Sequence, residues 1–187
     1  IGGDRDGNPF VVSQTTLDVA ARMREAILRR YYYDIRQLKR RLTFRGTEER
    51  IALAEQKINN TLYYPERDRY RSCQELLADL YEARRILLEE HDGLFLEDLD
   101  RFILKVRVFG FYFATIDIRQ DSRKHGEVWA AVLKNWQEKH PEFDLDAFYR
   151  AGEDARIQTL LTTPFDVDEN DYADPFVKET IASFRAI

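Results

Sequence analysis

Two stretches of this chain are dense in side chains that could do chemistry. One is the opening segment IGGDRDGNPF, in which Asp4, Arg5, Asp6 and Asn8 stand among glycines and a proline. The other is residues 109–125, FGFYFATIDIRQDSRKH, which begins with aromatic and β-branched residues and ends in charged and amide groups. Arginine offers a rigid fork of donors that suits phosphate or carboxylate. Arg119 therefore makes the second stretch a candidate for anion binding.

Arg119 is the most informative residue of the second stretch. The apolar run from Phe109, bounded by Gly110, predicts a strand buried on both faces, and the C-terminal end of such a strand is where barrels and open α/β sheets hold ligands. Alternation along a strand places Asp117 and Arg119 on the same side. Two interpretations stay open: Arg119 binds a ligand, or it forms a structural salt bridge with Asp117 or Asp121.

The opening segment fails three familiar motif tests. A phosphate-binding P-loop needs Lys and Ser or Thr after its last glycine, and neither is present. Counted from Asp4 as a calcium loop, the positions that require Gly and Glu are Pro9 and Thr15. The glycine spacing of a dinucleotide fingerprint is also absent. An Asx-rich turn would explain Asn8 and Pro9, but it would not explain Arg5 between two aspartates.

Composition limits the class of protein. The 187 residues are 44% hydrophobic and 34% charged, as in an ordinary soluble domain with a core. No apolar run approaches the ~20 residues that cross a bilayer, and the net charge of −5 argues against a general nucleic-acid binder. The single Cys73 excludes an internal disulfide framework and a multi-cysteine zinc site. We expect a cytoplasmic protein without membrane or nucleic-acid partners.

Hydrophobic spacing predicts a predominantly α-helical chain with one or two short strands. Ser72 with Glu75, and Asp174 with Pro175, are helix-start signals, whereas Thr15 with Asp18 suggests where the first helix begins. The expected helices cover about 15–42, 48–62, 72–93, 94–108 and 126–140, two short pieces within 145–161, and a last one from 175.

Two motifs together resemble the phosphoenolpyruvate carboxylase family. They are Gly2-Gly3-Asp4-Arg5-Asp6-Gly7-Asn8-Pro9 and Asp117-Ile118-Arg119-Gln120-Asp121-Ser122, with His125 completing the second. In this order, and separated by a helical insert, they are highly specific, although they cover only a small part of the chain.

The resemblance implies a piece of a larger (β/α)8 barrel that is heavily elaborated with helices. The chain would be a single partial domain, 1–187, in which both motifs lie at the C-terminal mouth of the barrel. Its parts would be an active-site loop at 1–12, a helical insert at 13–108, a barrel strand with the substrate motif at 109–125, and C-terminal helices at 126–187.

The resemblance also implies an activity. Phosphoenolpyruvate and bicarbonate would give oxaloacetate and phosphate, with Mg²⁺ or Mn²⁺ as the cofactor, in a larger enzyme expected to be a homotetramer. Arg119 and Gln120 would bind the substrate, and the mouth of the site would be lined by Asp4, Arg5, Asp6, Asn8 and Asp117. The family's catalytic histidine belongs to a Thr-Ala-His-Pro segment that this chain lacks, and its metal ligands lie elsewhere. We therefore assign no catalytic residue or metal ligand here, and we expect the isolated chain to be inactive.

A second function is suggested by the basic segment at residues 22–45. Its cationic residues could bind an acidic partner and make the chain a non-enzymatic helical interaction module. Such a module would have no need of the Asp-Ile-Arg-Gln motif at the end of a strand. The cations concerned are Arg29, Arg30, Arg36, Lys39, Arg40 and Arg41.

Overall fold

The structure is a computed structural model that describes residue 3 and residues 10–187. The chain divides into two compact units, one formed by Ile1–Asp18 with Ile116–Ile187 and the other by Val19–Thr115. Most of the described residues are helical, so the prediction of a predominantly α-helical chain is confirmed.

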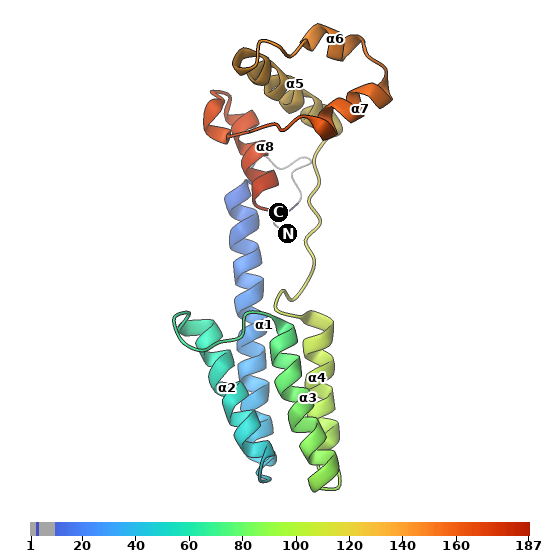
Figure 1. The fold of residues 1–187 in the computed structure, drawn as a ribbon. Helices are drawn as coiled ribbons and strands as arrows, with labels where there is room; N and C mark the ends of the chain where they lie inside the picture. Colours follow the sequence, from blue (N-terminus) through green and yellow to red (C-terminus); the bar gives the residue numbers. More distant parts are fainter. Residues whose placement is uncertain (1–2, 4–9) are drawn as a thin grey trace. The chain divides into compact units, whose positions relative to one another are not determined.

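The unit Val19–Thr115 is a group of helices that lie side by side in Figure 1. Short connections join them, as expected for consecutive antiparallel neighbours. The first helix begins in the other unit and continues through this one. The bounds are α1 Ser13–Arg41, α2 Thr47–Tyr63, α3 Cys73–Glu90 and α4 Leu96–Phe109.

Tyr31 of α1 lies at the centre of this unit's core and is fully buried. Its ring meets that of Phe102 edge-on, with 5.7 Å between the ring centroids. Its hydroxyl donates a hydrogen bond of 2.7 Å to the carbonyl oxygen of Gly110, just after α4 ends. Burial raises the pKa of the Tyr31 hydroxyl above its ordinary value. One buried side chain thus ties α1 to the end of α4.

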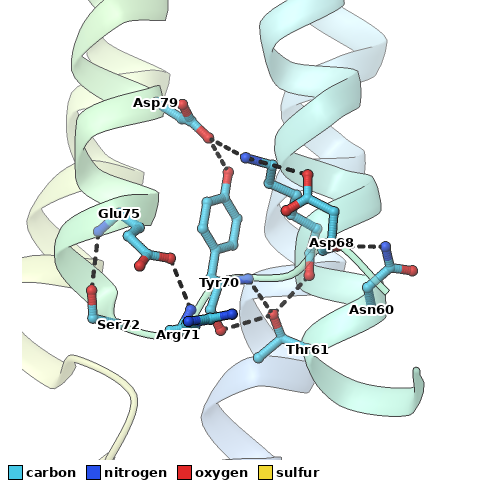
Figure 2. A network of polar contacts seen from close by, with 9 residues as sticks. Asn60, Thr61, Asp68, Tyr70, Arg71, Ser72, Glu75 and Asp79 are labelled. Atoms are coloured by element: carbon cyan, nitrogen blue, oxygen red, sulfur yellow. Dashed lines mark hydrogen bonds and ion pairs between the residues drawn. The ribbon is translucent and has the colours of Figure 1, made fainter. Parts of the chain in front are cut away.

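Tyr70 organises the connection between α2 and α3 through a polar network (Figure 2). Its side chain is 1% exposed, and its hydroxyl donates a hydrogen bond of 2.7 Å to Asp79 Oδ2. Lys57 Nζ lies 3.7 Å from the same carboxylate oxygen, and Thr61 Oγ1 accepts a 3.1 Å hydrogen bond from the Tyr70 backbone N–H. Burial, followed by the bond to Asp79, raises the pKa of Tyr70. The network satisfies polar groups that the loop would otherwise bury without partners.

The unit that contains residues 116–187 has, apart from α5 (Ser122–Lys139), shorter helices, and its core is smaller. Aspartates cap several of them: Asp121, Asp144 and Asp174 each accept a hydrogen bond from a backbone N–H in the first turn. Pro175 occupies the first helical position, as the sequence predicts. The bounds are α5 Ser122–Lys139, α6 Leu145–Arg150, α7 Glu153–Thr162, the 3₁₀ helix η1 Glu169–Asp171 and α8 Pro175–Arg185. The core holds Val128, Val132, Tyr172, Val177 and Ile181.

The prediction of a strand that begins at Phe109 is wrong. Phe109 is the last residue of α4, because the buried helical stripe of Phe102, Ile103 and Val106 carries the helix through to it. Gly110, with φ of 53°, then ends the helix.

Residues 115–118 have no regular secondary structure, and among the described residues Arg119 is an isolated bridge rather than part of a ladder. The expectation of burial on both faces is also wrong, since Tyr112 is 72% exposed and Ile118 is 38% exposed. A strand needs backbone hydrogen bonds to a neighbouring strand along its length. Among the described residues, this segment forms one such bond, from the Arg119 N–H to the Gly3 carbonyl oxygen.

Candidate functional site

The opening segment and the polar motif at 117–122 meet at Gly3. The backbone N–H of Arg119 donates a hydrogen bond of 2.9 Å to the carbonyl oxygen of Gly3. Both residues belong to the same compact unit, and Gly3 is buried. Gly3 and Arg119, which lie far apart in the sequence, are therefore neighbours in space.

The contact explains why a glycine stands at position 3. A Cβ atom added there would lie 2.1 Å from the carbonyl oxygen of Asp117 and 2.8 Å from Cγ2 of Ile116. Real Cβ atoms do not come so close to backbone oxygen, so any side chain would push the two segments apart. The absence of a side chain is what permits this close approach of two backbones.

The side chain of Arg119 is exposed and forms no ion pair with another described residue. Asp121, one of the two partners considered for a salt bridge, instead pairs with Arg123, whose Nη2 lies 2.7 Å from Asp121 Oδ2. Asp117, the other, is exposed and likewise has no ion pair within the described part of the chain. The structural salt bridge is therefore not formed, and the guanidinium of Arg119 is left available to a ligand.

Asp121 fixes the turn that follows Arg119. Its carboxylate caps α5 by accepting a hydrogen bond of 2.9 Å from the backbone N–H of Arg123. The hydrogen bonds from the Arg123 side chain and then from its backbone lower the pKa of Asp121, so the group is a stable anion. The backbone N–H of Asp121 donates a 3.2 Å bond to Gln120 Oε1. This bond orients the side-chain amide of Gln120.

A small hollow of about 130 Å³ lies beside Gln120. His125 of α5 and Thr180 and Ser183 of α8 contribute to its lining, and the His125 ring lies 5.4 Å from that of Phe184, centroid to centroid. Residues of α8 therefore lie next to Ile118 and Gln120 of the second motif. The sequence alone had no signal for this contribution, because Thr180 and Ser183 are ordinary residues of an amphipathic helix.

The structure brings together only part of the predicted site. Gly3, Asp117, Arg119 and Gln120 lie in one region, whereas Asp4, Arg5, Asp6 and Asn8 fall outside the described residues. Among the side chains that are described, no group of three His, Cys, Asp or Glu could hold a metal ion. No helix in the same part of the chain is long and apolar enough to cross a membrane.

Comparison with known families decides the class. The family model described as phosphoenolpyruvate carboxylase matches residues 1–55 and 44–163 and so includes both motifs. The chain belongs to the phosphoenolpyruvate carboxylase family. Within it, the Gly3–Arg119 contact joins the two segments by which the resemblance was first identified.

Two curated relatives place the chain within the family. It is 26% identical over 185 residues to a phosphoenolpyruvate carboxylase of Synechocystis sp., an alignment that covers 72% of this chain and 18% of the relative. It is also 26% identical over 200 residues to one of Nocardia farcinica, covering 86% of this chain and 21% of the relative. The chain spans about a fifth of the length of these carboxylases. The alignments are longer than the parts of this chain that they cover, so these carboxylases carry residues here that this chain lacks.

Proposed function

We propose that this chain forms part of a lyase that carboxylates phosphoenolpyruvate with bicarbonate to give oxaloacetate and phosphate. Family membership supports this assignment. The observation that supports particular residues is the backbone hydrogen bond between Arg119 and Gly3, which joins the second motif to the one described residue of the opening motif. In this proposal both segments belong to the mouth of an elaborated (β/α)8 barrel, where the chemistry of such barrels takes place.

Arg119 is proposed to hold the phosphate of phosphoenolpyruvate. Transfer of that phosphoryl group concentrates negative charge on its oxygens, which a planar guanidinium can meet with two parallel hydrogen bonds. The guanidinium is exposed and has no carboxylate partner among the described residues, so no internal ion pair has to be broken first. The side-chain amide of Gln120, oriented by Asp121, would add a neutral donor to the same ligand.

The cofactor proposed with this reaction is Mg²⁺ or Mn²⁺, and we place its ligands outside this chain. Among the described residues, no three His, Cys, Asp or Glu side chains lie close enough together to hold such an ion. We therefore derive the role of this segment from its own groups: Arg119 binds an anion, Gln120 donates to it, and Gly3 lets the two backbones meet.

The proposal is tested with two proteins. The complete carboxylase that contains this sequence should form oxaloacetate from phosphoenolpyruvate and bicarbonate, measured by coupled reduction with malate dehydrogenase and NADH. The isolated 187-residue chain should show no rate above background, because in this proposal the metal ligands and the catalytic base belong to other parts of the complete enzyme. A complete protein that forms no oxaloacetate would remove the proposal. We further propose that the complete enzyme is cytoplasmic and homotetrameric. Sedimentation of the complete enzyme would test the tetramer, and fractionation of cells would test the location.

The alternative of a basic interaction module is not favoured. Five of its six cations already have carboxylates within 4.0 Å: Arg29 with Glu25, Arg30 with Asp34, Arg36 and Lys39 with Glu55, and Arg41 with Asp98. A helix whose positive charges are paired internally offers less to an acidic partner. Salt-sensitive binding to polyanions that does not change on alteration of Arg119 would revive the alternative.

A further inference from the structure

Two hollows adjoin in the unit that contains residues 116–187. The polar hollow is the one of about 130 Å³ beside Gln120, and the apolar hollow, of about 370 Å³, lies between α5 and α8. His125 of α5 and Phe184 of α8 line both, and their rings lie 5.4 Å apart, centroid to centroid. Every residue that lines the two hollows is described and belongs to the same compact unit. The two hollows can therefore hold different ends of one molecule.

The polar hollow is lined by groups whose hydrogen bonds are not made within the chain. Thr180 is 4% exposed, and its hydroxyl has no hydrogen-bond partner among the described residues. The ring nitrogens of His125 have none in the same part of the chain. Oε1 of Gln120 accepts from the Asp121 N–H, which leaves its Nε2 donors open. Polar groups in so enclosed a place normally have partners, so the hollow suits a group that both donates and accepts.

The apolar hollow has the size and lining of a small-molecule site. Such sites measure about 300–1,000 Å³ and combine an apolar wall with a few convergent polar groups. Trp129 and Phe184 line it and are 44% and 62% exposed, so both rings are open to a partner. Aromatic rings pack well against other rings in tilted or offset arrangements. The aliphatic residues of the wall are Val128, Val132, Val167 and Ile181.

The charges around the two hollows favour an uncharged ligand. The polar hollow is lined by no Asp, Glu, Lys or Arg. Arg185, at the wall of the apolar hollow, is already engaged: its Nη1 lies 2.9 Å from Oε2 of Glu169, and its Nη2 donates a 2.7 Å bond to the Val167 carbonyl oxygen. A charged molecule would give up its hydration here without gaining a free counter-charge.

We propose that the two hollows form one binding site for an uncharged molecule with an aromatic body and a hydroxyl or amide head. The body lies in the apolar hollow against Trp129 and Phe184. The head lies in the polar hollow, where it bonds to Thr180 and His125. The site goes beyond the proposed function and does not depend on it, because binding is measured without turnover.

The first test measures the binding of para-fluorobenzyl alcohol to the complete carboxylase by fluorine NMR. This probe carries the ring and the hydroxyl that the site calls for, and it should bind with a dissociation constant of about 1 mM. Para-fluorotoluene has the same ring without the hydroxyl and serves as the matched probe. It should reach the apolar hollow without bonding to Thr180.

Thr180→Val is the variant that decides the polar end. Valine keeps the shape of threonine and removes the hydroxyl, so binding of the alcohol should weaken about fivefold while binding of para-fluorotoluene stays unchanged. Thr162→Val, the same change at an exposed position of α7 that lines neither hollow, is the control. Because the Thr180 hydroxyl has no partner among the described residues, Thr180→Val should unfold no earlier than wild type on heating.

Val167→Phe decides the apolar end. Val167 lies outside the helices, and a larger side chain there should fill the apolar hollow and weaken the binding of both probes at least about tenfold. Thermal unfolding is measured alongside. If Val167→Phe does not fold, Trp129→Ala takes its place, because it removes an exposed ring of the same wall and should also weaken both probes.

The remaining outcomes contradict the inference. A complete carboxylase that does not bind the alcohol at about 10 mM overturns the site, including the case in which another part of the enzyme fills the hollows. Binding that Thr180→Val leaves unchanged, or that it weakens equally for both probes, overturns it too. A probe that still binds the apolar-end variant lies elsewhere, with the same consequence. A complete protein that binds the alcohol as expected but makes no oxaloacetate contradicts only the proposed function.

Discussion

The carbonyl oxygen of Asp117 lies 2.1 Å from the point at which a Cβ atom on Gly3 would stand. Two backbones approach this closely only where one of them carries no side chain. The approach brings the backbone N–H of Arg119 within 2.9 Å of the Gly3 carbonyl oxygen. The position of Arg119 relative to the opening segment therefore depends on glycine at position 3.

Gly3→Ala in the complete carboxylase should strongly lower carboxylation. The new methyl group cannot fit against Asp117 and Ile116, so the segments must separate and the Arg119–Gly3 bond must break. Gly152→Ala is the matched control, since a Cβ there meets nothing within 4 Å, and its kcat/KM should stay near wild type. Steady-state kinetics of both variants test the prediction, and equal activities would contradict it.

Arg119→Ala should weaken substrate binding in the same enzyme. Loss of a charge-assisted contact to phosphate costs about 2–4 kcal/mol in kcat/KM. Arg119→Lys should recover only part of it, because an ammonium is a point charge without the planar fork. Arg107→Ala, at an exposed position of α4, should be silent in the same assay. Unchanged kinetics for Arg119→Ala would take this residue out of the site.

Tyr70→Phe should destabilise the unit Val19–Thr115. The change removes the 2.7 Å bond to Asp79 while leaving that carboxylate beside Lys57, at a cost of about 1–2 kcal/mol. Tyr63→Phe is a suitable control because Tyr63 is 49% exposed, and it should cost little. Urea unfolding followed by circular dichroism measures both, and the idea fails if the two variants have the same midpoint.

The free energy of unfolding should fall at alkaline pH through Tyr31 and Tyr70, the two buried tyrosines of the unit Val19–Thr115. The pKa values of Tyr31 and Tyr70 are raised in the folded chain, chiefly by burial, so the folded state keeps protons that the unfolded chain releases. Their contribution is full below the ordinary tyrosine value of about 10 and is lost as pH rises from there towards the folded values. Within that pH range, each tyrosine lowers the free energy of unfolding by about 1.4 kcal/mol per pH unit.

Tyr31→Phe and Tyr70→Phe should each reduce the slope of the unfolding free energy against pH by the contribution of one proton, about 1.4 kcal/mol per pH unit. Unfolding free energies measured between pH 9 and pH 11 give the slope directly. A slope that is the same in wild type and in both variants would show that other groups cause the alkaline loss.

Much of the local structure was predictable from neighbouring residues. Ser72 accepts a 3.4 Å bond from the Glu75 N–H at the start of α3, and Asp174 with Pro175 starts α8, as their types and spacing indicate. Such signals work because a cap is made within one helical turn. The motif that contains Arg119 and Gln120 is likewise recognised from neighbouring residues, and the binding of substrate by these two residues stays a prediction.

The residues by themselves determined the helices, the motifs and the family resemblance, because each is encoded over a few neighbouring positions. Only the tertiary structure decided that Phe109 ends a helix and that Gly3 lies against Asp117. It also decided that Glu179 of α8 caps α1 by accepting a hydrogen bond from the Ser13 N–H. A strand exists only where another backbone pairs with it, and a cap from a distant helix exists only where folding brings the two together. No local pattern records contacts between segments more than a hundred positions apart.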